Sequence, residues 1–449
     1  MLLVGGSGFV GCRLGTMLAR QGVFIHLLTR KVKKGLSYPA LQFEWDGRGE
    51  IPQRALDGVE AIVNLAGESI GSGRWSEAKK KKIVESRVQT TKNVVLAANK
   101  YGIKTLLQAS AIGFYGDSKD QILSEDSRGG EGFLAHTVKE WEKSLQLLNG
   151  GTRLVVMRMG VVLGSEGGAF FDLTKPYLMG FGAMVGGGLK YFSFIHVEDI
   201  CRFMVDALRQ ESFKGVYNLT APNPVTYREL HESLLDYYSG FSWLKVPEVF
   251  LRLFLGKKSE LVLTSQRVLP KRLMEGGFSF KYASIEAALG EILRKDLKNA
   301  QIKDCSQWVP KGVDNVWGFF SDEKNLEKLT PPFLHFHVDH MSTEHIEQGS
   351  IIQYKLKLHG LPIKWRSKIS HFKKHDRFVD EQIKGPYETW HHTHSFEALG
   401  EGTLIKDRIY YRLPFGFLGR MVASLMVARD VAKIFRYRKD MADKVFTNG

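Results

Sequence analysis

Short apolar runs alternate with helix-like stretches through the first half of the chain. Such runs occur at the amino terminus and again at residues 23–28, 61–65, 104–108 and 153–157. This alternation of strands and helices is typical of a doubly wound parallel sheet with helices on both faces. The pattern therefore predicts an α/β fold for the first part of the chain.

Beyond this alternation the chain becomes glycine-rich and irregular at residues 164–188, and further helices are expected at 200–209 and 284–297. Irregular segments at the carboxyl edge of such a sheet commonly shape a substrate pocket. We therefore expect a first domain over residues 1–298, with a small substrate lobe formed mainly by residues 164–190 and 220–280.

The hydrophobic pattern changes its period near residue 300. Apolar and polar positions now alternate, in strands expected at residues 334–338, 350–358, 363–372, 378–383, 388–396 and 403–411. A helix is expected before them at 313–320, and a long amphipathic helix after them at about 418–446. Period-two alternation predicts an antiparallel sheet, so residues 299–449 are expected to form a separate α+β domain.

The first strand leads directly into the turn GGSGFVG, and a helix is expected after it at about residues 12–21. Gly5 permits the tight turn, Gly8 lets the backbone approach a diphosphate, and Gly11 lets the helix pack on its strand. Free N–H groups at the start of that helix favour a negatively charged ligand. We predict a dinucleotide-binding loop formed by Gly5, Gly6, Ser7, Gly8, Phe9, Val10 and Gly11.

The end of the second strand distinguishes between the two nicotinamide dinucleotides. An acidic residue about 20 positions past the glycines would bind the ribose hydroxyl of NAD, whereas an arginine accommodates the 2′-phosphate of NADP. Thr29 and Arg30 occupy this place, with Lys31 and Lys33 close behind and no acidic residue in reach. Because a guanidinium can donate two hydrogen bonds to a phosphate, the sequence favours NADP(H).

Charge and cysteine content narrow the function classes. The 449 residues carry a formal charge of +15. The densest basic run, residues 79–82, lies in a helix-like stretch and is typical of a solvent-exposed helix face. No nucleic-acid partner is therefore expected. No stretch approaches the roughly 18 apolar residues of a membrane span. The three cysteines lack metal-ligand spacing, and the first strand leaves no room for a signal peptide. We therefore expect a cytoplasmic protein without a transmembrane segment.

Several stretches of the first 298 residues resemble the extended short-chain dehydrogenases, in the divergent branch known as epimerase-family proteins. These stretches are GGSGFVG, WDG at 45–47, NLAGESI at 64–70, RWSEAKKKKIVESR up to Arg87, SAIGFYG at 110–116, RMGVVLG at 158–164, FSFIHVEDI at 192–200 and SQRVLPKRLMEGGFSF at 265–280. The resemblance implies a Rossmann fold that binds NADP(H) and acts on a small carbonyl or hydroxyl substrate.

Carried over residue by residue, the same resemblance implies further cofactor contacts. Thr29 and Arg30 would hold the adenosine phosphate, and Asp46 would lie near the adenine. The remaining implied contacts are Leu65, Ala66 and Gly67 along the cofactor path, Arg87 towards the diphosphate and Val161 at the nicotinamide end.

The catalytic pair of this family is missing from its usual place. In these enzymes a tyrosine and a lysine one helical turn apart pass a proton while hydride moves. The corresponding stretch, LAHTVKEWE, carries Leu134 and Val138 in the two positions, and neither side chain can transfer a proton. The literal YxxxK at residues 115–119 follows a strand in a loop, so it matches a different tyrosine of the family.

Other polar groups near the expected nicotinamide site are candidates for the missing role. Ser110 lies five residues before Tyr115, whereas the usual spacing in the family is four residues, which would place Ala111 in the serine position. Ser110 could still face the cofactor if the end of the strand bulges. Glu68 leaves its strand beside the nicotinamide region. The candidate catalytic residues are therefore Ser110, Tyr115 and Glu68, with His136, Lys139 and His196 as alternatives. For His196 the pattern favours packing or capping.

Residues 300–449 resemble the START-like, helix-grip domains of the polyketide cyclase and dehydrase relatives. The likeness rests on VDNVWGFFSDEKNLEKLTPP, IKWRSKI, FVDEQIKGPYETWHHTH and GTLIKDRIYY. It implies a curved sheet around a long helix, an apolar cavity between them and a hydrophobic ligand. The apolar face of the last helix is suited to cover this cavity as a lid. Because the helix also carries arginines, binding to a membrane surface is the alternative. The apolar residues of the helix are Leu418, Met421, Val422, Leu425, Met426 and Ala432.

Histidines alternate in two of the expected strands, His335 with His337 and His392 with His394. Each pair projects to one face of the sheet, and two such pairs could bind zinc. Because no cysteine or carboxylate accompanies them at a fixed spacing, the pattern favours a polar sheet face or a cavity lining, and no metal site is predicted.

Two hypotheses about function follow. The first is an NADP(H)-dependent oxidoreductase or epimerase-like enzyme for a small carbonyl or hydroxyl substrate, fused to a domain that binds a hydrophobic molecule. The second is a protein without turnover that senses NADP(H) and binds a ligand. Loss of the tyrosine–lysine pair favours the second, whereas the glycine-rich substrate lobe favours the first.

Overall fold

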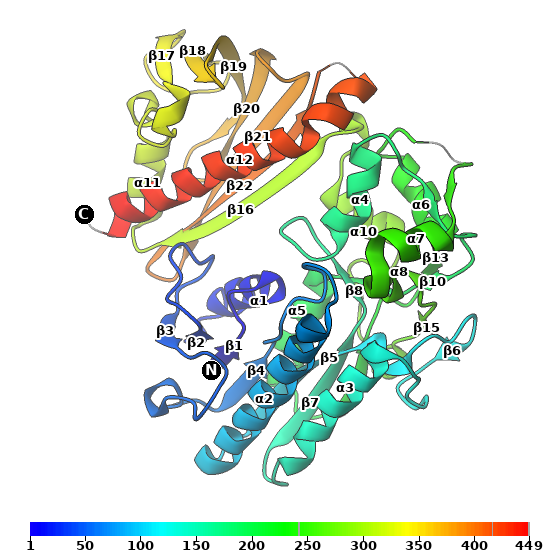
Figure 1. The fold of residues 1–449 in the computed structure, drawn as a ribbon. Helices are drawn as coiled ribbons and strands as arrows, with labels where there is room; N and C mark the ends of the chain where they lie inside the picture. The colour runs from blue at the N-terminus through cyan, green and yellow to red at the C-terminus, as the bar shows by residue number, and fades with distance from the viewer. Residues whose placement is uncertain (241–242, 415, 448–449) are drawn as a thin grey trace.

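Two seven-stranded sheets organise the chain in the computed structural model, which describes residues 1–240, 243–414 and 416–447 (Figure 1). All strands of the first sheet are parallel, in the order β12-β7-β5-β4-β1-β2-β3. They are β1 (Leu2–Val4), β2 (His26–Thr29), β3 (Leu41–Glu44), β4 (Ala61–Asn64), β5 (Thr105–Ala111), β7 (Arg153–Met159) and β12 (Gly215–Leu219). The strand order reverses beside β1, so the predicted doubly wound Rossmann-type sheet is confirmed.

Helices bury both faces of this sheet. Leu3 packs with α1 (Phe9–Ala19) and α5 (Val197–Arg209), whereas its neighbours Leu2 and Val4 pack with α2 (Glu77–Tyr101) on the other face. α3 (Phe133–Lys143) lies beside α2. Because successive residues of β1 are buried on opposite faces, the strand has to be apolar throughout.

Short elements lie between and after the main strands, and several of them cover residues 164–190 and 220–280, where a substrate lobe is expected. The helices among these elements are α4 (Phe170–Leu178), α6 (Tyr227–Leu235), α7 (Glu248–Leu255), α8 (Glu260–Leu263), α9 (Lys271–Glu275) and α10 (Ile285–Ile292). The strand pairs are β8 (Val161–Leu163) with β11 (Phe194–His196), β9 (Met184–Val185) with β14 (Lys245–Val246), β10 (Tyr191–Phe192) with β13 (Val225–Thr226), and β6 (Ile122–Leu123) with β15 (Arg267–Val268).

The second domain is an antiparallel sheet covered by one long helix, α12 (Gly416–Thr447), which runs across the sheet in Figure 1. The strand order is β16-β22-β21-β20-β19-β18-β17. The strands are β16 (Gln301–Val309), β17 (His337–Met341), β18 (Ile351–Leu358), β19 (Leu361–Lys373), β20 (Arg377–Lys384), β21 (Thr389–Leu399) and β22 (Gly402–Arg412), and α11 (Val313–Phe320) follows β16. The predicted antiparallel domain after residue 300 is confirmed.

Several predicted elements need correction. The strand expected at 334–338 begins only at His337, because Pro332–Leu334 forms a 3-10 turn and His335 adopts a left-handed φ of 43°. The helix expected at 284–297 ends at Ile292, and α1 begins at Phe9 instead of residue 12. β16 was not predicted, because its polar residues do not follow a simple alternation.

The two domains pack firmly against each other. Ile302 and Tyr410 of the second domain join the hydrophobic cluster of α6 and α10, and the Tyr410 hydroxyl donates to the carbonyl of Ile292 at 3.2 Å. The backbone N–H of Trp308 donates to the carbonyl of Leu36, in the segment that follows β2, at 2.6 Å. The second sheet is therefore anchored both to α6 and α10 and to the segment that follows β2.

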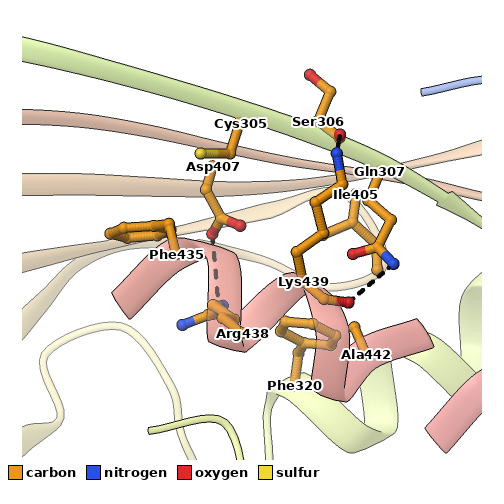
Figure 2. A pocket seen from close by; sticks show the side chains of 10 residues that line it. All are labelled: Cys305, Ser306, Gln307, Phe320, Ile405, Asp407, Phe435, Arg438, Lys439 and Ala442. Carbon is orange, nitrogen blue, oxygen red and sulfur yellow. Dashed lines mark hydrogen bonds and ion pairs between the residues drawn. The ribbon is translucent and has the colours of Figure 1, made fainter. Parts of the chain in front are cut away.

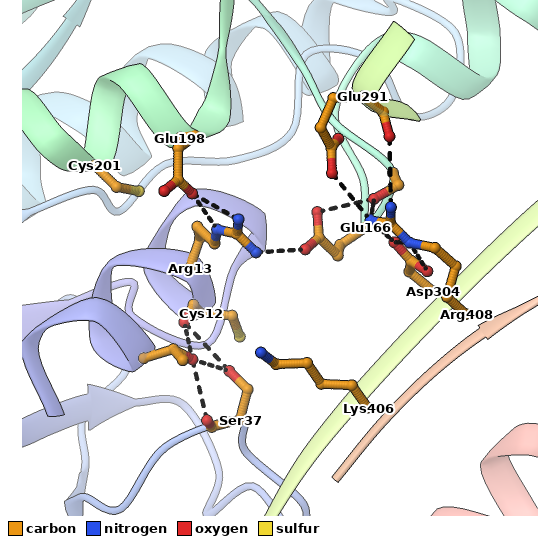
Figure 3. Close-up of polar contacts among 12 residues, drawn as sticks. Cys12, Arg13, Ser37, Glu166, Glu198, Cys201, Glu291, Asp304, Lys406 and Arg408 are labelled. Atoms are coloured by element: carbon orange, nitrogen blue, oxygen red, sulfur yellow. Dashed lines mark hydrogen bonds and ion pairs between the residues drawn. The ribbon is translucent and has the colours of Figure 1, made fainter. Parts of the chain in front are cut away.

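Arg408 of β22 is the centre of the polar part of this interface (Figure 3). Its guanidinium lies 3.2 Å from Glu291 of α10, 2.8 Å from Asp304 of β16 and 3.2 Å from the hydroxyl of Ser165. Burial alone would raise the pKa of Glu291, but His196 and Arg408 outweigh it and lower this pKa to about 2. Glu291 is therefore ionised throughout the neutral range.

Replacing Arg408 by glutamine is expected to lower the free energy of unfolding by about 1–3 kcal/mol at neutral pH, because two carboxylates lose their partly buried counter-charge. A carboxylate with a depressed pKa stabilises the folded state above its usual pKa of 4.5, and this stability is lost as the pH falls towards 2. Denaturant titrations at neutral pH and at about pH 3 should therefore show a smaller loss on acidification for the variant than for the wild type.

Arg366→Gln, which changes an exposed arginine of β19, serves as the control. Equal stability of Arg408→Gln and the wild type at neutral pH would contradict the anchoring role of this guanidinium.

Candidate functional site

The glycine loop is shaped by contacts that exclude any side chain. Gly5 has a φ of 81°, and a Cβ atom there would lie 2.9 Å from the backbone of Leu65 and Ala66. A Cβ atom on Gly11 would lie 2.5 Å from Cα of Gly6. The loop, the end of β4 and the start of α1 can therefore meet only because these positions are glycine.

The amino terminus of α1 is open at this loop. Gly8 is the N-cap residue, is exposed and makes no side-chain cap, so the first N–H groups of the helix remain available to a ligand. Ser7, Phe9 and Val10 are partly buried around it. Ideal Cβ atoms on Gly164, Gly167 and Gly168 would come within 3.0 Å of the Phe9 side chain, so the glycine-rich segment after β8 packs closely on the start of α1.

The predicted adenosine side of the site lies at the ends of β2 and β3. Thr29 is buried, and its hydroxyl donates to the carbonyl of Lys31 at 2.8 Å, whereas Arg30 is exposed. Asp46 is also exposed and accepts a hydrogen bond from the N–H of Arg48 at 2.9 Å. The structure thus leaves Arg30 and Asp46 at the surface, and their contact with a cofactor stays a prediction.

The end of β4 forms the opposite wall. Leu65 and Ala66 are partly buried beside Gly5, and Gly67 is exposed above the guanidinium of Arg87. Arg87 donates to the carbonyls of Glu68 and Ile83 at 3.0 and 3.1 Å, and burial lowers its pKa to about 10. Arg87 therefore holds the backbone of the segment after β4 through its hydrogen bond to Glu68.

Glu68 is held in an ion-pair cluster. Lys79 donates to its carboxylate at 2.6 Å and Lys82 lies 3.7 Å away. The hydrogen bond from Lys79 is the main reason that the pKa of Glu68 is lowered, and Lys82 and Arg30 lower it further. Arg30 and Glu68 thus share one rim of the site, and Glu68 is an ionised acceptor there instead of a proton donor.

Ser110 and Tyr115 belong to a polar chain inside the domain. The Ser110 hydroxyl donates to Glu142 at 2.6 Å, and the same carboxylate binds Arg158 through contacts of 2.9 and 2.7 Å. Arg158 also donates to the Tyr115 hydroxyl at 3.0 Å, which donates to Asn218 at 2.7 Å. Burial raises the pKa of Tyr115 more than Arg158 lowers it, so this phenol stays protonated at neutral pH. Sequence reasoning missed the pairing of Glu142 with Arg158, which joins α3 to β7.

The place of the missing catalytic pair is apolar. An ideal Cβ atom on Gly113, in the 3-10 turn after β5, would lie 3.4 Å from Leu134 and 3.7 Å from Val138. Leu134 and Val138, which occupy the tyrosine and lysine positions on α3, therefore both face this turn, while His136 and Lys139 are exposed.

His196 is a capping residue, as its sequence context indicated. It is buried at the end of β11, and its Nδ1 accepts from the N–H of Glu198 at 3.3 Å to cap α5. Its Nε2 lies 3.3 Å from Glu291. Val161 is half-buried at the start of β8, where its N–H donates to the carbonyl of Ser193 at 2.9 Å.

In the second domain the sheet and α12 lie close together (Figure 2). The cavity between them measures about 20 Å³, which is room for about one water molecule. Met421 and Met426 are exposed, and the side chains of Leu418, Arg420, Val422 and Leu425 lie outside the described part of the chain. None of the helices in the described residues combines the length and the apolar character that crossing a membrane requires.

Comparison with known proteins places this geometry in a family. A family model described as the NAD dependent epimerase/dehydratase family matches residues 1–220, and a model described as a domain of unknown function matches residues 246–292. The epimerase family protein YfhF of Bacillus subtilis is 37% identical over 295 residues, which cover 65% of this chain and 97% of YfhF. The chain belongs to the NAD dependent epimerase/dehydratase family.

Solved structures of epimerase-family proteins show the same fold. The crystal structure of human epimerase family protein SDR39U1 (isoform2) with NADPH matches 65% of this chain and 98% of that protein, with a TM-score of 0.59 and 30% sequence identity. The nucleoside-diphosphate sugar epimerase of Corynebacterium glutamicum has a TM-score of 0.53 and 30% identity, over 65% of this chain and 57% of that protein. The START-like resemblance of the second domain stays a prediction.

Tyr115→Phe tests whether the polar chain is structural. The variant leaves a donor of Arg158 and an acceptor of Asn218 without their partner, so its free energy of unfolding should fall by about 1–3 kcal/mol. Nucleotide affinity should not change, because the phenol is held inside the domain. Thermal and denaturant unfolding, with Tyr101→Phe at the end of α2 as a control, measure the first effect, and calorimetry measures the second. Wild-type stability combined with weakened nucleotide binding would show instead that the phenol acts at the site.

Proposed function

We propose that this epimerase-family protein binds NADP(H) at the glycine loop and uses it to transfer hydride to or from a small carbonyl or hydroxyl substrate. The observation that carries the proposal is the combination of a glycine cradle with an exposed Arg30 at the end of β2. The cradle suits a diphosphate, because the open start of α1 offers N–H groups to it. The guanidinium of Arg30 suits the additional phosphate of NADP.

The residues of the loop fit such a cofactor, which supplies or accepts a hydride when bound. Gly5 and Gly11 hold the loop against β4, and the N–H groups that follow Gly8 would bind the diphosphate. Val161 and the segment after β8 would enclose the nicotinamide end. The human relative whose structure is described as containing NADPH supports the choice of cofactor.

Arg30→Ala tests the choice between the two dinucleotides. A charge-assisted hydrogen bond contributes about 1.5–3 kcal/mol, so the variant should bind NADPH about 10- to 100-fold more weakly and NADH with unchanged affinity. Calorimetric titration measures both constants. Lys81→Ala, which removes an exposed charge of α2, should leave both constants unchanged. An Arg30→Ala protein that keeps its preference for NADPH would refute the role of this guanidinium.

A second candidate function is a sensor that binds NADP(H) without turnover. The specific support is the apolar pair Leu134 and Val138 in the catalytic position, together with the engaged hydroxyls of Ser110 and Tyr115. In that case the glycine loop and Arg30 would act as in the first proposal, but no proton donor would be needed.

The two candidates are separated by following NADPH absorbance with a panel of carbonyl compounds of varied size and polarity. The enzyme hypothesis predicts oxidation of NADPH by at least one class of carbonyl, and loss of this oxidation in Arg30→Ala at low NADPH concentration. Tight NADPH binding without oxidation across the whole panel would favour the sensor.

We also propose that the second domain takes up a hydrophobic molecule between its sheet and α12. The support is a long helix that lies across an antiparallel sheet. Because the cavity lined by Phe320, Asp407 and Phe435 measures only about 20 Å³, α12 would have to move away from the sheet to admit a ligand there. Mass spectrometry of the natively purified protein would detect a co-purified apolar molecule.

A further inference from the structure

Three polar side chains converge inside the second domain, away from the glycine loop. His392 and His394 lie on the same face of β21, and Asp407 lies beside them on β22, where it pairs with His394 across the two strands. Asp407 Oδ1 is 2.9 Å from Nε2 of His392 and 2.8 Å from Nδ1 of His394. All three side chains are buried, and the three ligand atoms lie within 4.8 Å of one another.

One oxygen atom joins the two histidines at the centre of this cluster. Asp407 Oδ1 faces a ring nitrogen of each histidine, so two imidazoles and one carboxylate point towards the same small volume. Imidazole nitrogens and carboxylate oxygens are the kinds of ligand atom that bind transition-metal ions.

The hydrogen bonds at His394 conflict. Its Nδ1 atom lies 2.8 Å from the Asp407 carboxylate, which can only accept, and 3.1 Å from a guanidinium nitrogen of Arg438, which can only donate. A neutral imidazole nitrogen carries either a proton or a lone pair, so it satisfies one of these neighbours and not the other. A cation placed between Nδ1 and the carboxylate would use both lone pairs at once.

We propose that His392, His394 and Asp407 bind one divalent first-row transition-metal ion of the zinc type. Two imidazoles and one carboxylate are a common ligand set for such ions, with a water in the remaining position. Metal–ligand distances of about 2.0–2.1 Å place ligand atoms about 3.3 Å apart in a tetrahedral site. The oxygen–nitrogen distances of 2.8 and 2.9 Å therefore have to increase by only about half an ångström.

Arg438 is the group that a metal ion would displace. Its guanidinium lies 3.8 Å from Asp407, and its Nε atom has no hydrogen-bond partner among the described residues. Figure 2 shows it beside the 20 Å³ cavity, which Asp407 and Cys305 also line. This cavity is large enough for the water that would complete the coordination.

A carboxylate is available nearby to take over the charge of Arg438. Asp380 on β20 pairs with His392 across the strands, and its buried Oδ1 atom has no hydrogen-bond partner among the described residues. Asp380 lies close enough to Arg438 and His392 to interact electrostatically with both. When the metal ion neutralises Asp407, the guanidinium can turn towards Asp380, so no buried charge is left without a counter-charge.

The test uses the full chain without an affinity histidine tag, stripped by a chelator and titrated with Co²⁺ and with Zn²⁺. One ion should bind per chain, the Co²⁺ complex should show the strong visible absorption of four- or five-coordinate cobalt, and Zn²⁺ should raise the melting temperature. Absence of stoichiometric uptake of either ion by the folded wild-type chain would overturn the proposal, and this measurement does not depend on any variant.

Variants locate the ion. His392→Gln should weaken Zn²⁺ binding at least about 100-fold, since a metal site loses a ligand. Arg438→Gln should strengthen it about tenfold, because a neighbouring positive charge is removed. His340→Gln, an exposed histidine of β17, should bind like the wild type. Unchanged Zn²⁺ affinity in His392→Gln would show that the ion binds elsewhere and would refute the site. If Arg438 had only a structural role, Arg438→Gln would not increase the Zn²⁺ affinity.

Discussion

The close approach of two backbone segments at the carboxyl edge of the parallel sheet sets the geometry of the amino-terminal domain. The turn after β1 touches the backbone after β4 so closely that no Cβ atom fits at Gly5, and α1 starts so close to the turn that none fits at Gly11. The first N–H groups of α1 consequently face outwards beside the ends of β2 and β4. The proposed cofactor contacts depend on this arrangement, because a diphosphate would lie at the helix start and the additional phosphate of NADP at Arg30.

The second domain is connected to this loop through the segment that follows β8. Gly164, Gly167 and Gly168 pack on Phe9 at the start of α1, and Ser165 between them accepts a hydrogen bond from Arg408 of β22. Arg13 of α1 forms ion pairs with Glu166 and Glu198 on the same side, as Figure 3 shows. Contacts of Ser165 and its neighbouring glycines therefore join β22 to the start of α1.

Much of the fold is predictable from local pattern, and the limits of that prediction have physical causes. The alternation of apolar runs predicted the parallel sheet, and the helix at Val313–Phe320 was predicted with its observed bounds. β16 was missed because its polar residues serve the interface, where Asp304 binds Arg408. His335 was predicted to lie in a strand because it alternates with His337. The 3-10 turn at Pro332–Leu334 breaks that alternation, and the spacing of the histidines does not indicate the turn.

The candidate site shows a similar division. The roles of the glycines and of Arg30 could be predicted from the sequence, because each is indicated by residues that are close to it along the chain. The partners of Ser110 and Tyr115 could not, because Glu142, Arg158 and Asn218 come from three other elements. The joining of His392 and His394 by Asp407 likewise depends on the register between β21 and β22, which no single-strand pattern contains.

We propose that the turn after β1 holds a dinucleotide whose adenosine ribose carries a phosphate. Parallel calorimetric titrations of the folded wild-type chain with NADPH and with NADH are the decisive experiment. We expect one NADPH bound per chain, with clearly higher affinity than NADH. Equal affinity for the two, or no binding of either, would contradict it.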